Sequence, residues 1–597
     1  MAPFTSLGVF LGLFLVLIPL ALGEVFTSTP RKTIQYHNAK IFRENGISNY
    51  STMTLTEDLG ILFIGARDAV YALDLENISS KKAGVYWQVS EEQKMSCKTR
   101  GKDSMECQNY IKTLEALDDG WMLVCGTNAY NPTCDEEAME FDLPDKLRVS
   151  HVARDCKEDM GGLRTLQQKW TSYLMARLDC PMPLEPSLPA IIQDVFLLKD
   201  QDWRKSVFYA VFSPQTCFDD YATTSDLSTA CAFSVADIGS EGRYLTPVTM
   251  ESETRWVAHT GEQPVPRPGA CMNNAARDLG VEHSLDLPDK TLQFVRDRPL
   301  MEGAVPPLTG GPLVLQRGAK FSGIVVDRVM AMNGEIYHVM FIGTEEDKVQ
   351  KVVQYAGGDT ISQTPEPIKV MGLSSGTGQL YAGSESCLVQ FPVSDCGRYG
   401  SCLDCILARD PYGSWETTSA ACSSVLNLPT GSRNMHQSLL HVDSSMYPRS
   451  VTVQPVPFPF IVGSPIHLPC QPASNLAQVS WHFARQPLQL RDRYRMMSQD
   501  LLIVSAVASD ADRYTCQSLE EVKGRLYTRT EAVYILQPTK TLLVLQSSVA
   551  VLSVLLGAVV LWSVRKSVRK RSEFTQQDRV RTTTTGEQAL VVYLGVM

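Results

Sequence analysis

The sequence predicts a mainly β extracellular protein, cross-linked by disulfides and anchored by one membrane-spanning helix. Three observations support this. Short β-branched and aromatic runs alternate with turn signals through the body of the 597-residue chain, an uncharged apolar segment stands near each end, and all sixteen cysteines lie between Cys97 and Cys516. With 44% hydrophobic and 20% charged residues, the chain is neither disordered nor collagen-like.

The first 23 residues are typical of a signal peptide. They carry no charged side chain, contain the apolar run 9–22, and end on the small residues Ala21 and Gly23 just before Glu24. This order of an apolar core followed by small residues is that of a cleavable secretion signal. The segment lacks the usual basic residue at its start, so a buried N-terminal helix is the alternative.

The second apolar segment, residues 541–562, predicts a transmembrane helix. Its 22 residues carry no charge, which is about the length that spans a bilayer. Lys540 precedes it, and a basic cluster follows it: Arg565, Lys566, Arg569, Lys570 and Arg571. Such an excess holds a flank in the cytoplasm, whereas a buried core helix is the alternative. We therefore expect a single-pass type I protein of the plasma membrane with an extracellular ectodomain and a cytoplasmic tail at 563–597.

The charge is distributed unevenly about this span. The whole chain has a net charge of −10, and the tail carries seven basic and three acidic residues, so the rest of the chain carries −14. An acidic ectodomain attracts a basic partner surface at long range. It is a poor candidate for nucleic-acid binding, because that function needs a dense basic patch.

The ectodomain shows short strand-like runs without helical spacers. Several of these end in Gly and a small residue, and they recur along the chain: 60–66, 70–74, 121–127, 207–212, 336–344 and 380–384. A repeating strand–turn unit of this kind favours a closed β architecture such as a propeller. Two unlinked β-sandwiches are the alternative, because periodicity does not count blades.

The cysteines and sequons fit an oxidising compartment, where disulfides are the default. Cys402 and Cys405 form a CxxC, but no second CxxC or pair of His completes a metal site, so we expect neither a metal nor a cofactor. Two N-x-S/T sequons, at Asn49 and Asn77, are predicted glycosylation sites.

No catalytic constellation stands out, so an enzyme is not expected. One GxSxG occurs at 372–376, but a nucleophile elbow needs a helix after the Ser, and here a strand-like segment follows. We interpret it as a hairpin turn. The nine His show neither HxH nor HExxH spacing.

Several co-linear motifs resemble one known family. They are Tyr50–Asp58, Leu62–Leu73, Glu106–Ile111, Cys125–Cys134, Arg154–Lys157, Gly161–Thr171, Pro266–Cys271 and Leu287–Val295. Together they are similar to the semaphorins, and most similar to the class 4 transmembrane members. Cys396, Cys402 and Cys405 followed by Trp415 match the start of a PSI module, whereas Cys470, Trp481 and Cys516 have immunoglobulin spacing.

The resemblance implies a domain order. It gives a signal peptide at 1–23, a Sema β-propeller at 24–393, a PSI module at 394–423, an Ig-like β-sandwich at 450–537, the span at 541–562 and the tail at 563–597. The family propeller has seven blades. The implied function is a membrane-anchored ligand that binds plexin receptors of the B or D class, as a homodimer, in axon guidance, neural crest development and cell migration.

The resemblance also implies disulfide pairs. By analogy these are Cys97–Cys107, Cys125–Cys134, Cys156–Cys271, Cys180–Cys231 and Cys470–Cys516. The pairing of the other cysteines stays open: Cys217, Cys387, Cys396, Cys402, Cys405 and Cys422.

Two departures from the family pattern change the expectation. After Cys134 the chain passes almost directly to the 149–156 motif, so about two blades of some 40–45 residues each are absent. Either a smaller ring closes or the propeller folds poorly, because open sheet edges expose unpaired backbone groups. This leaves a non-signalling or decoy variant as the second functional hypothesis. In the PSI module Gly413 replaces the cysteine that pairs with Cys396 in the family, so Cys396 is expected either to bond Cys387 or to bond another chain.

Overall fold

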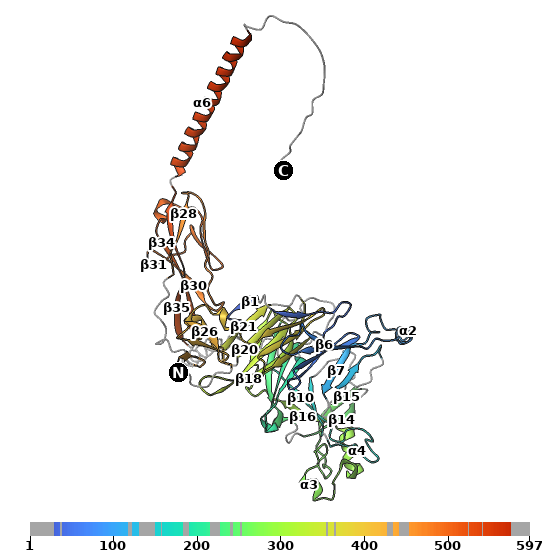
Figure 1. Cartoon of the computed structure of the whole chain (residues 1–597). Helices are drawn as coiled ribbons and strands as arrows, with labels where there is room; N and C mark the ends of the chain where they lie inside the picture. The colour runs from blue at the N-terminus through green and yellow to red at the C-terminus, as the bar shows by residue number, and fades with distance from the viewer. Residues whose placement is uncertain are drawn as a thin grey trace, which may run out of the picture. The chain divides into compact units, whose positions relative to one another are not determined.

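The computed structural model is mostly strand (Figure 1). It describes residues 29–35, 39–116, 122–130, 150–156, 158–182, 190–214, 227–238, 243–250, 253–353, 356–362, 366–426, 434–440, 453–522, 524–539 and 541–574. Two compact units are present. The first comprises 1–449 with 473–477 and 520–527, and the second comprises 450–472, 478–519 and 528–597.

The first sheet shows why these residues form strands. It has the order β3-β4-β5-β6, with β3 (Thr52–Thr56), β4 (Ile61–Ala66), β5 (Ala69–Asp74) and β6 (Lys81–Tyr86). Gly60 turns the chain between β3 and β4 with a φ of 63°, a conformation that glycine adopts without strain. Leu62 and Ile64 alternate on the buried face of β4.

The N-terminal strand completes the last propeller sheet. That sheet has the order β2-β24-β23-β22, so that β2 (Lys40–Phe42) pairs antiparallel with β24 (Leu388–Pro392). Its other strands are β22 (Val370–Ser374) and β23 (Gln379–Gly383). The pairing links residues about 350 positions apart, so it fastens the two ends of the propeller together.

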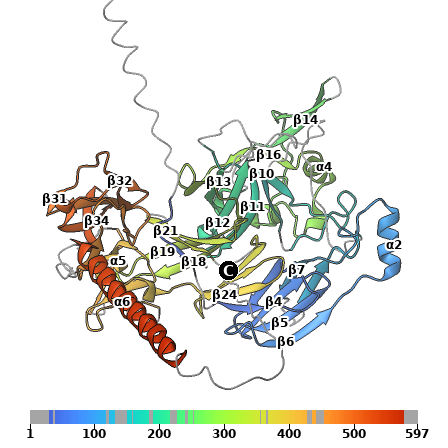
Figure 2. The ribbon, with the colours of Figure 1, turned by 90° about the horizontal axis from the view of Figure 1, so that it is seen from above.

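Two further sheets follow beside it. One has the order β1-β21-β20-β19-β18 and the other β11-β12-β13-β17. The bounds are β1 (Thr33–Gln35), β11 (Ala190–Leu198), β12 (Val207–Pro214), β13 (Leu227–Ser234), β17 (Val314–Arg317), β18 (Phe321–Met330), β19 (Ile336–Thr344), β20 (Lys348–Val353) and β21 (Ala356–Ser362). The inner strands β11, β18, β22 and β3 contact one another in that order. Figure 2 shows these sheets from above.

The sheets approach closely where glycine leaves room. A Cβ on Gly372 of β22 would lie 2.4 Å from the sulfur of Met53 on β3. This is the first glycine of the GxSxG, and β22 pairs directly with β23 across the 375–378 turn. The interpretation of that motif as a hairpin turn is therefore confirmed, and Gly372 serves sheet packing.

The interrupted side of the propeller is built differently. β7 (Ile111–Ala116) and β8 (Met122–Gly126) form a two-stranded sheet, and β7 contacts β3 and β4. A separate sheet has the order β16-β10-β9, with β9 (His151–Arg154), β10 (Leu174–Leu178) and β16 (Leu300–Val305). Leu174 and Leu178 of β10 share a core with Phe212 of β12. Among the described strands, β8 and β9 are each paired on one side only.

The first unit also contains several short helices and strands. Helix α2 (Glu91–Thr99) begins with a capping box at Ser90, in which Ser90 and Gln93 exchange hydrogen bonds. The others are β14 (Leu245–Met250), β15 (Glu253–Ala258), α3 (Asn274–Arg277), α4 (Asp289–Asp297), α5 (Cys402–Leu407), β25 (Gly413–Glu416), β26 (Ala421–Ser424) and β27 (Met435–His436).

The C-terminal domain is a sandwich of two sheets. The sheet orders are β28-β35-β34-β30-β31 and β29-β33-β32. The bounds are β28 (Val456–Phe460), β29 (Ile466–Leu468), β30 (Gln478–Phe483), β31 (Gln486–Pro487), β32 (Tyr494–Met497), β33 (Asp500–Ile503), β34 (Arg513–Val522) and β35 (Arg525–Pro538). Trp481 is buried in the same core as Cys470 and Cys516.

The last element is helix α6 (Thr541–Phe574). Within it, Val549–Ser567 is apolar and long enough to cross a membrane. The mainly β fold with one C-terminal apolar helix is thus confirmed.

Candidate functional site

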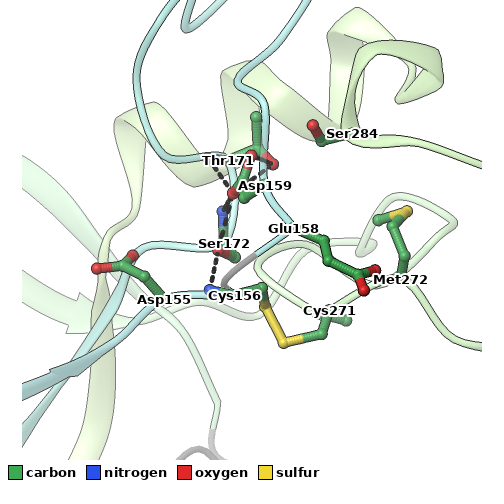
Figure 3. Close-up of a pocket in the computed structure, with 10 residues that line it drawn as sticks. Asp155, Cys156, Glu158, Asp159, Thr171, Ser172, Cys271, Met272 and Ser284 are labelled. Carbon is green, nitrogen blue, oxygen red and sulfur yellow. Dashed lines mark hydrogen bonds between the residues drawn. A yellow bond between two sulfur atoms is a disulfide. The ribbon is translucent and has the colours of Figure 1, made fainter. Parts of the chain in front are cut away.

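A pocket of about 320 Å³ lies immediately after β9, next to the interruption of the propeller. Figure 3 shows that the disulfide Cys156–Cys271 forms part of its wall. The pocket is lined by the two short segments that this disulfide joins, by a third segment and by one distant serine: Asp155, Cys156, Glu158, Asp159, Ala270, Cys271, Met272, then Thr171 and Ser172, and Ser284.

Asp159 organises the wall of the pocket. Its carboxylate accepts hydrogen bonds from the backbone N–H of Thr171 at 2.7 Å, from that of Ser172 at 2.8 Å and from that of Gly161 at 3.0 Å. The hydroxyls of Thr171 and Ser172 add further bonds (Figure 3). Burial by itself would raise the pKa of Asp159, but these hydrogen bonds outweigh it and hold the pKa below its usual range.

The other two carboxylates point to solvent. Asp155 and Glu158 are exposed on either side of Cys156, and Figure 3 shows Glu158 near Met272. Partial burial, and then the nearby charge of Asp159, raise the pKa of Asp155. The pocket is therefore an acidic recess with an apolar wall at Ala270 and Met272.

Figure 3 shows the carboxylates of Asp155 and Glu158 on opposite sides of Cys156. Across the described residues, no group of three His, Cys, Asp or Glu is arranged to hold a metal ion.

Four of the disulfides implied by the resemblance are formed in the structure. They are Cys97–Cys107, Cys156–Cys271, Cys180–Cys231 and Cys470–Cys516. Cys125 is also disulfide-bonded, whereas Cys134 and Cys217 lie outside the described residues. A fifth bond, Cys405–Cys422, joins two of the cysteines whose pairing the resemblance leaves open.

Three further cysteines are reduced and buried. Cys387, Cys396 and Cys402 form no disulfide, so the predicted bond between Cys387 and Cys396 is wrong. The thiol of Cys396 is buried against the carbonyl of Tyr412 and the hydroxyl of Ser394. A bond from Cys396 to another chain stays a prediction. Burial raises the pKa of Cys402 to about 11, so this CxxC lacks the low-pKa thiolate of a redox pair.

The two sequon asparagines differ in setting. Asn77 is exposed in the turn after β5. Asn49 is half-buried with a φ of 61°, and its side-chain amide donates to Glu385 at 3.4 Å. Asn77 is therefore the more accessible glycan acceptor.

Sequence reasoning did not find the pocket. Asp159 and its partners Thr171 and Ser172 are twelve and thirteen residues apart, and only the tertiary turn brings them together. Their only signal is their place near the family motifs: Asp159 lies between Arg154–Lys157 and Gly161–Thr171, Thr171 ends the second motif and Ser172 follows it.

Two family descriptions match the chain. "Sema domain" matches residues 192–375, and "Semaphorin-3/4/7A, immunoglobulin-like domain" matches residues 458–545. The first covers β11 to the hairpin of β22, and the second covers the sandwich.

Curated relatives match over most of the chain. Semaphorin-4D of Mus musculus is 34% identical over 644 positions, covering 88% of this chain and 74% of the relative. Semaphorin-4C of Mus musculus is 29% identical, covering 82% and 72%. The first alignment is longer than the whole 597-residue chain. The relative therefore contains residues without a counterpart here, as an interruption of the propeller requires.

Solved structures share the fold. Drosophila Semaphorin 2a aligns with a TM-score of 0.65 at 21% identity, covering 86% of this chain and 99% of its own. A structure described as Drosophila Plexin A in complex with Semaphorin 1b aligns with a TM-score of 0.54 at 23% identity, covering 69% and 98%. The Sema-type propeller is thus the fold of the first unit, and the alternative of two unlinked sandwiches is wrong.

Proposed function

The chain belongs to the class 4 semaphorins, and from this premise we propose that it is a membrane-anchored ligand that binds a plexin receptor on a facing cell. The observation that carries the proposal is the order of Sema-type propeller, Ig-like sandwich and apolar helix in one chain. The curated relatives are semaphorins, and we propose that this chain, like them, is a ligand rather than an enzyme.

The plexin part of the proposal has two supports. A structural neighbour is described as a complex of a plexin with a semaphorin. The ectodomain carries a net charge of −14, and the pocket at Asp155 and Glu158 offers carboxylates to a basic side chain. Both favour a partner with a basic contact surface. A plexin of class B or D, acting in axon guidance and cell migration, remains the proposal.

Topology, oligomeric state and modification belong to the same proposal. We place residues 24–540 outside the cell, the span at 541–562 and the tail 563–597 in the cytoplasm, with glycans on Asn49 and Asn77 and a homodimer at the plasma membrane. Digestion of surface protein with an N-glycosidase should increase its mobility. An unchanged electrophoretic mobility would contradict both the predicted glycans and the extracellular placement of residues 24–540.

One observation favours a second function. Among the described strands, β7 and β8 form a two-stranded sheet, and β9, β10 and β16 form a three-stranded sheet, whereas other propeller sheets have four or five strands. Propellers position their contact loops through blade packing, so a receptor surface that includes this side would be displaced. A decoy that keeps the other modules and binds plexin weakly fits this observation.

Binding distinguishes the two functions. The 24–540 ectodomain should be compared with a variant in which a family-like segment is inserted between Glu140 and Arg148, each titrated against plexin B and D ectodomains by surface plasmon resonance. A ligand binds plexin without the insertion. A decoy binds tightly only after it, and the absence of binding by both proteins would reject plexin as the partner.

A further inference from the structure

One end of the Ig-like domain is the end at which the chain leaves for α6. The last residues of β35 lie beside the last residue of β28, since Phe460 pairs with Pro538 and its carbonyl accepts from the N–H of Thr539 at 2.8 Å. The N–H of Leu536 donates to the carbonyl of Asp512 at 3.0 Å, just before β34 begins. The turn after β28 and the start of β34 therefore share this end.

Aliphatic side chains are exposed at this end. Ile461 and Val462 follow β28 and are 52% and 55% exposed, and Val504 is 41% exposed. The N–H of Gly463 donates to the carbonyl of Ala506 at 2.7 Å, and the N–H of Ala506 donates to the carbonyl of Ser464 at 3.0 Å, so the turn is held against the segment after β33. A bulky aliphatic pair at the tip of a rigid turn is costly in water, and it is suited to insertion at an apolar boundary.

Arginines surround this apolar turn. The N–H of Ala484 donates to the carbonyl of Arg513 at 3.0 Å, which places Arg485 and Arg513 side by side. Both are exposed, and neither makes an ion pair within the described residues. Arg493 lies next to Val504, whose N–H donates to its carbonyl at 2.9 Å. Guanidinium groups bind phosphate oxygens in a bidentate fashion.

Aspartates limit the net charge of this end. Asp510 accepts from the Arg493 guanidinium at 2.8 Å, Asp512 accepts from the backbone of Arg513, and Asp492 is exposed. The nearly balanced charge disfavours a highly sulfated polysaccharide, which needs a strong field. It suits zwitterionic lipid headgroups, where arginine–phosphate pairs and aliphatic insertion act locally.

The chain between this end of the Ig-like domain and the predicted span is short, so this end lies near the membrane. Residues 541–562 are uncharged, and 22 helical residues span about 33 Å, close to the roughly 30 Å of a hydrocarbon core. Thr539 is two residues before this segment, and ten residues before Val549, where the apolar segment described above begins; ten helical residues span about 15 Å. We propose that this end of the Ig-like domain binds the phosphocholine headgroup layer of the membrane that α6 crosses, with Ile461 and Val462 inserted. The inference rests on the proposed membrane anchoring and adds a lipid-binding face to it.

Quenching by brominated lipid tests insertion. The full chain carrying Val462→Trp is reconstituted in phosphatidylcholine vesicles, with or without bromine near the top of the acyl chains. Interfacial side chains lie about 5–10 Å into the headgroup–acyl boundary. After the signal of the wild-type chain, which includes Trp562 of the span, is subtracted, the added tryptophan should be quenched at least about twofold more than the tryptophan of the control variant. Leu526→Trp is the matched control, because Leu526 is 66% exposed near the opposite end of β35. Equal quenching of the two variants overturns the proposal.

Charge reversal tests the arginines. Arg485→Glu with Arg513→Glu, added to Val462→Trp, should reduce the extra quenching, whereas Arg525→Glu at the far end of β35 should not. If the double change abolishes retention on heparin but leaves the quenching intact, the two arginines bind a polyanion, and their assignment to lipid phosphate is wrong. Resistance of the full chain to alkaline extraction is measured in parallel. Extraction of the protein rejects the membrane anchor itself, whereas a resistant protein without quenching rejects only the lipid-binding face.

Discussion

Residues 394–423, where the sequence predicts a PSI module, share one local arrangement with the Ig-like domain; we keep the name PSI module for this segment. In each, a tryptophan lies opposite a disulfide-bonded cysteine on the neighbouring strand, Trp481 with Cys516 and Trp415 with Cys422. The Ig-like disulfide is surrounded by a core of its own. The PSI disulfide shares a much smaller cluster that includes the reduced Cys396.

The PSI module compensates by packing on the propeller. Lys351 of β20 donates to the carboxylate of Asp410 at 2.6 Å and lies over the ring of Tyr412, whose hydroxyl donates to Asp327 of β18. All four side chains are buried. Small modules bury too little surface to fold on their own core, so disulfides and neighbours must supply stability. The comparison teaches that one module is self-sufficient and the other is not.

The largest effect should come from breaking the contact on which the PSI module depends. Lys351→Met leaves Asp410 as an uncompensated buried charge, which costs about 3–5 kcal/mol. We expect faster proteolysis within residues 394–423 and a lower urea midpoint for the ectodomain. Lys320→Met is the control, since Lys320 and Glu345 form an exposed pair that contributes at most about 1 kcal/mol. Equal effects of the two changes would contradict a dependent PSI module.

The two disulfides should contribute different amounts to the free energy of unfolding, because they close loops of different length. Cys470→Ala opens a 46-residue separation and should cost about 4 kcal/mol, whereas Cys405→Ala opens 17 and should cost about 3 kcal/mol, by the chain-entropy relation. Urea unfolding of the two variant ectodomains, followed by peptide mapping of the protease-sensitive segment, measures both. If the Cys470→Ala protein resists urea and protease as well as the wild-type protein does, the sandwich core alone is enough to stabilise the Ig-like domain.

A missing bond should be restorable in the PSI module. A Cβ on Gly413 would lie 3.3 Å from the sulfur of Cys396, and the φ of Gly413 lies outside the left-handed region. Gly413→Cys should therefore place a thiol that bonds Cys396, and the new disulfide should add about 3 kcal/mol by closing a loop of roughly 17 residues. A non-reduced peptide map identifies the bond, and thermal unfolding measures the gain. Gly413→Ala is the control; a free thiol at position 413 would show that the geometry is unsuitable.

The sequence predicts local features better than contacts between distant segments. The strand-like run at 60–66 and the interpretation of 372–376 as a hairpin depend on neighbouring residues, so pattern and spacing suffice. The Cys470–Cys516 pair followed from the family's spacing. By contrast, the Asp159 pocket and the Lys351–Asp410 contact join segments 12 and 59 residues apart through the fold. Nothing in their local sequence marks them.

The smallest effect on stability should come from a buried carboxyl group in the propeller, on which the PSI module packs. Asp194 of β11 accepts from the N–H of Ile324 on β18 at 2.8 Å, and burial raises its pKa to about 6. A carboxyl whose pKa is raised on folding stabilises the protein below its unfolded pKa of about 4 and loses that contribution as pH rises through about 6. Asp194→Asn keeps an acceptor without the charge, so it should stabilise the ectodomain at pH 7 by up to about 3 kcal/mol. Urea midpoints of both proteins from pH 4 to 7 should converge at the acid end and diverge toward neutrality. Because the change acts on the propeller, proteolysis within the PSI module should slow, while the Ig-like domain stays unaffected. If the urea midpoints of the two proteins change with pH in parallel, Asp194 is not the group that makes stability depend on pH.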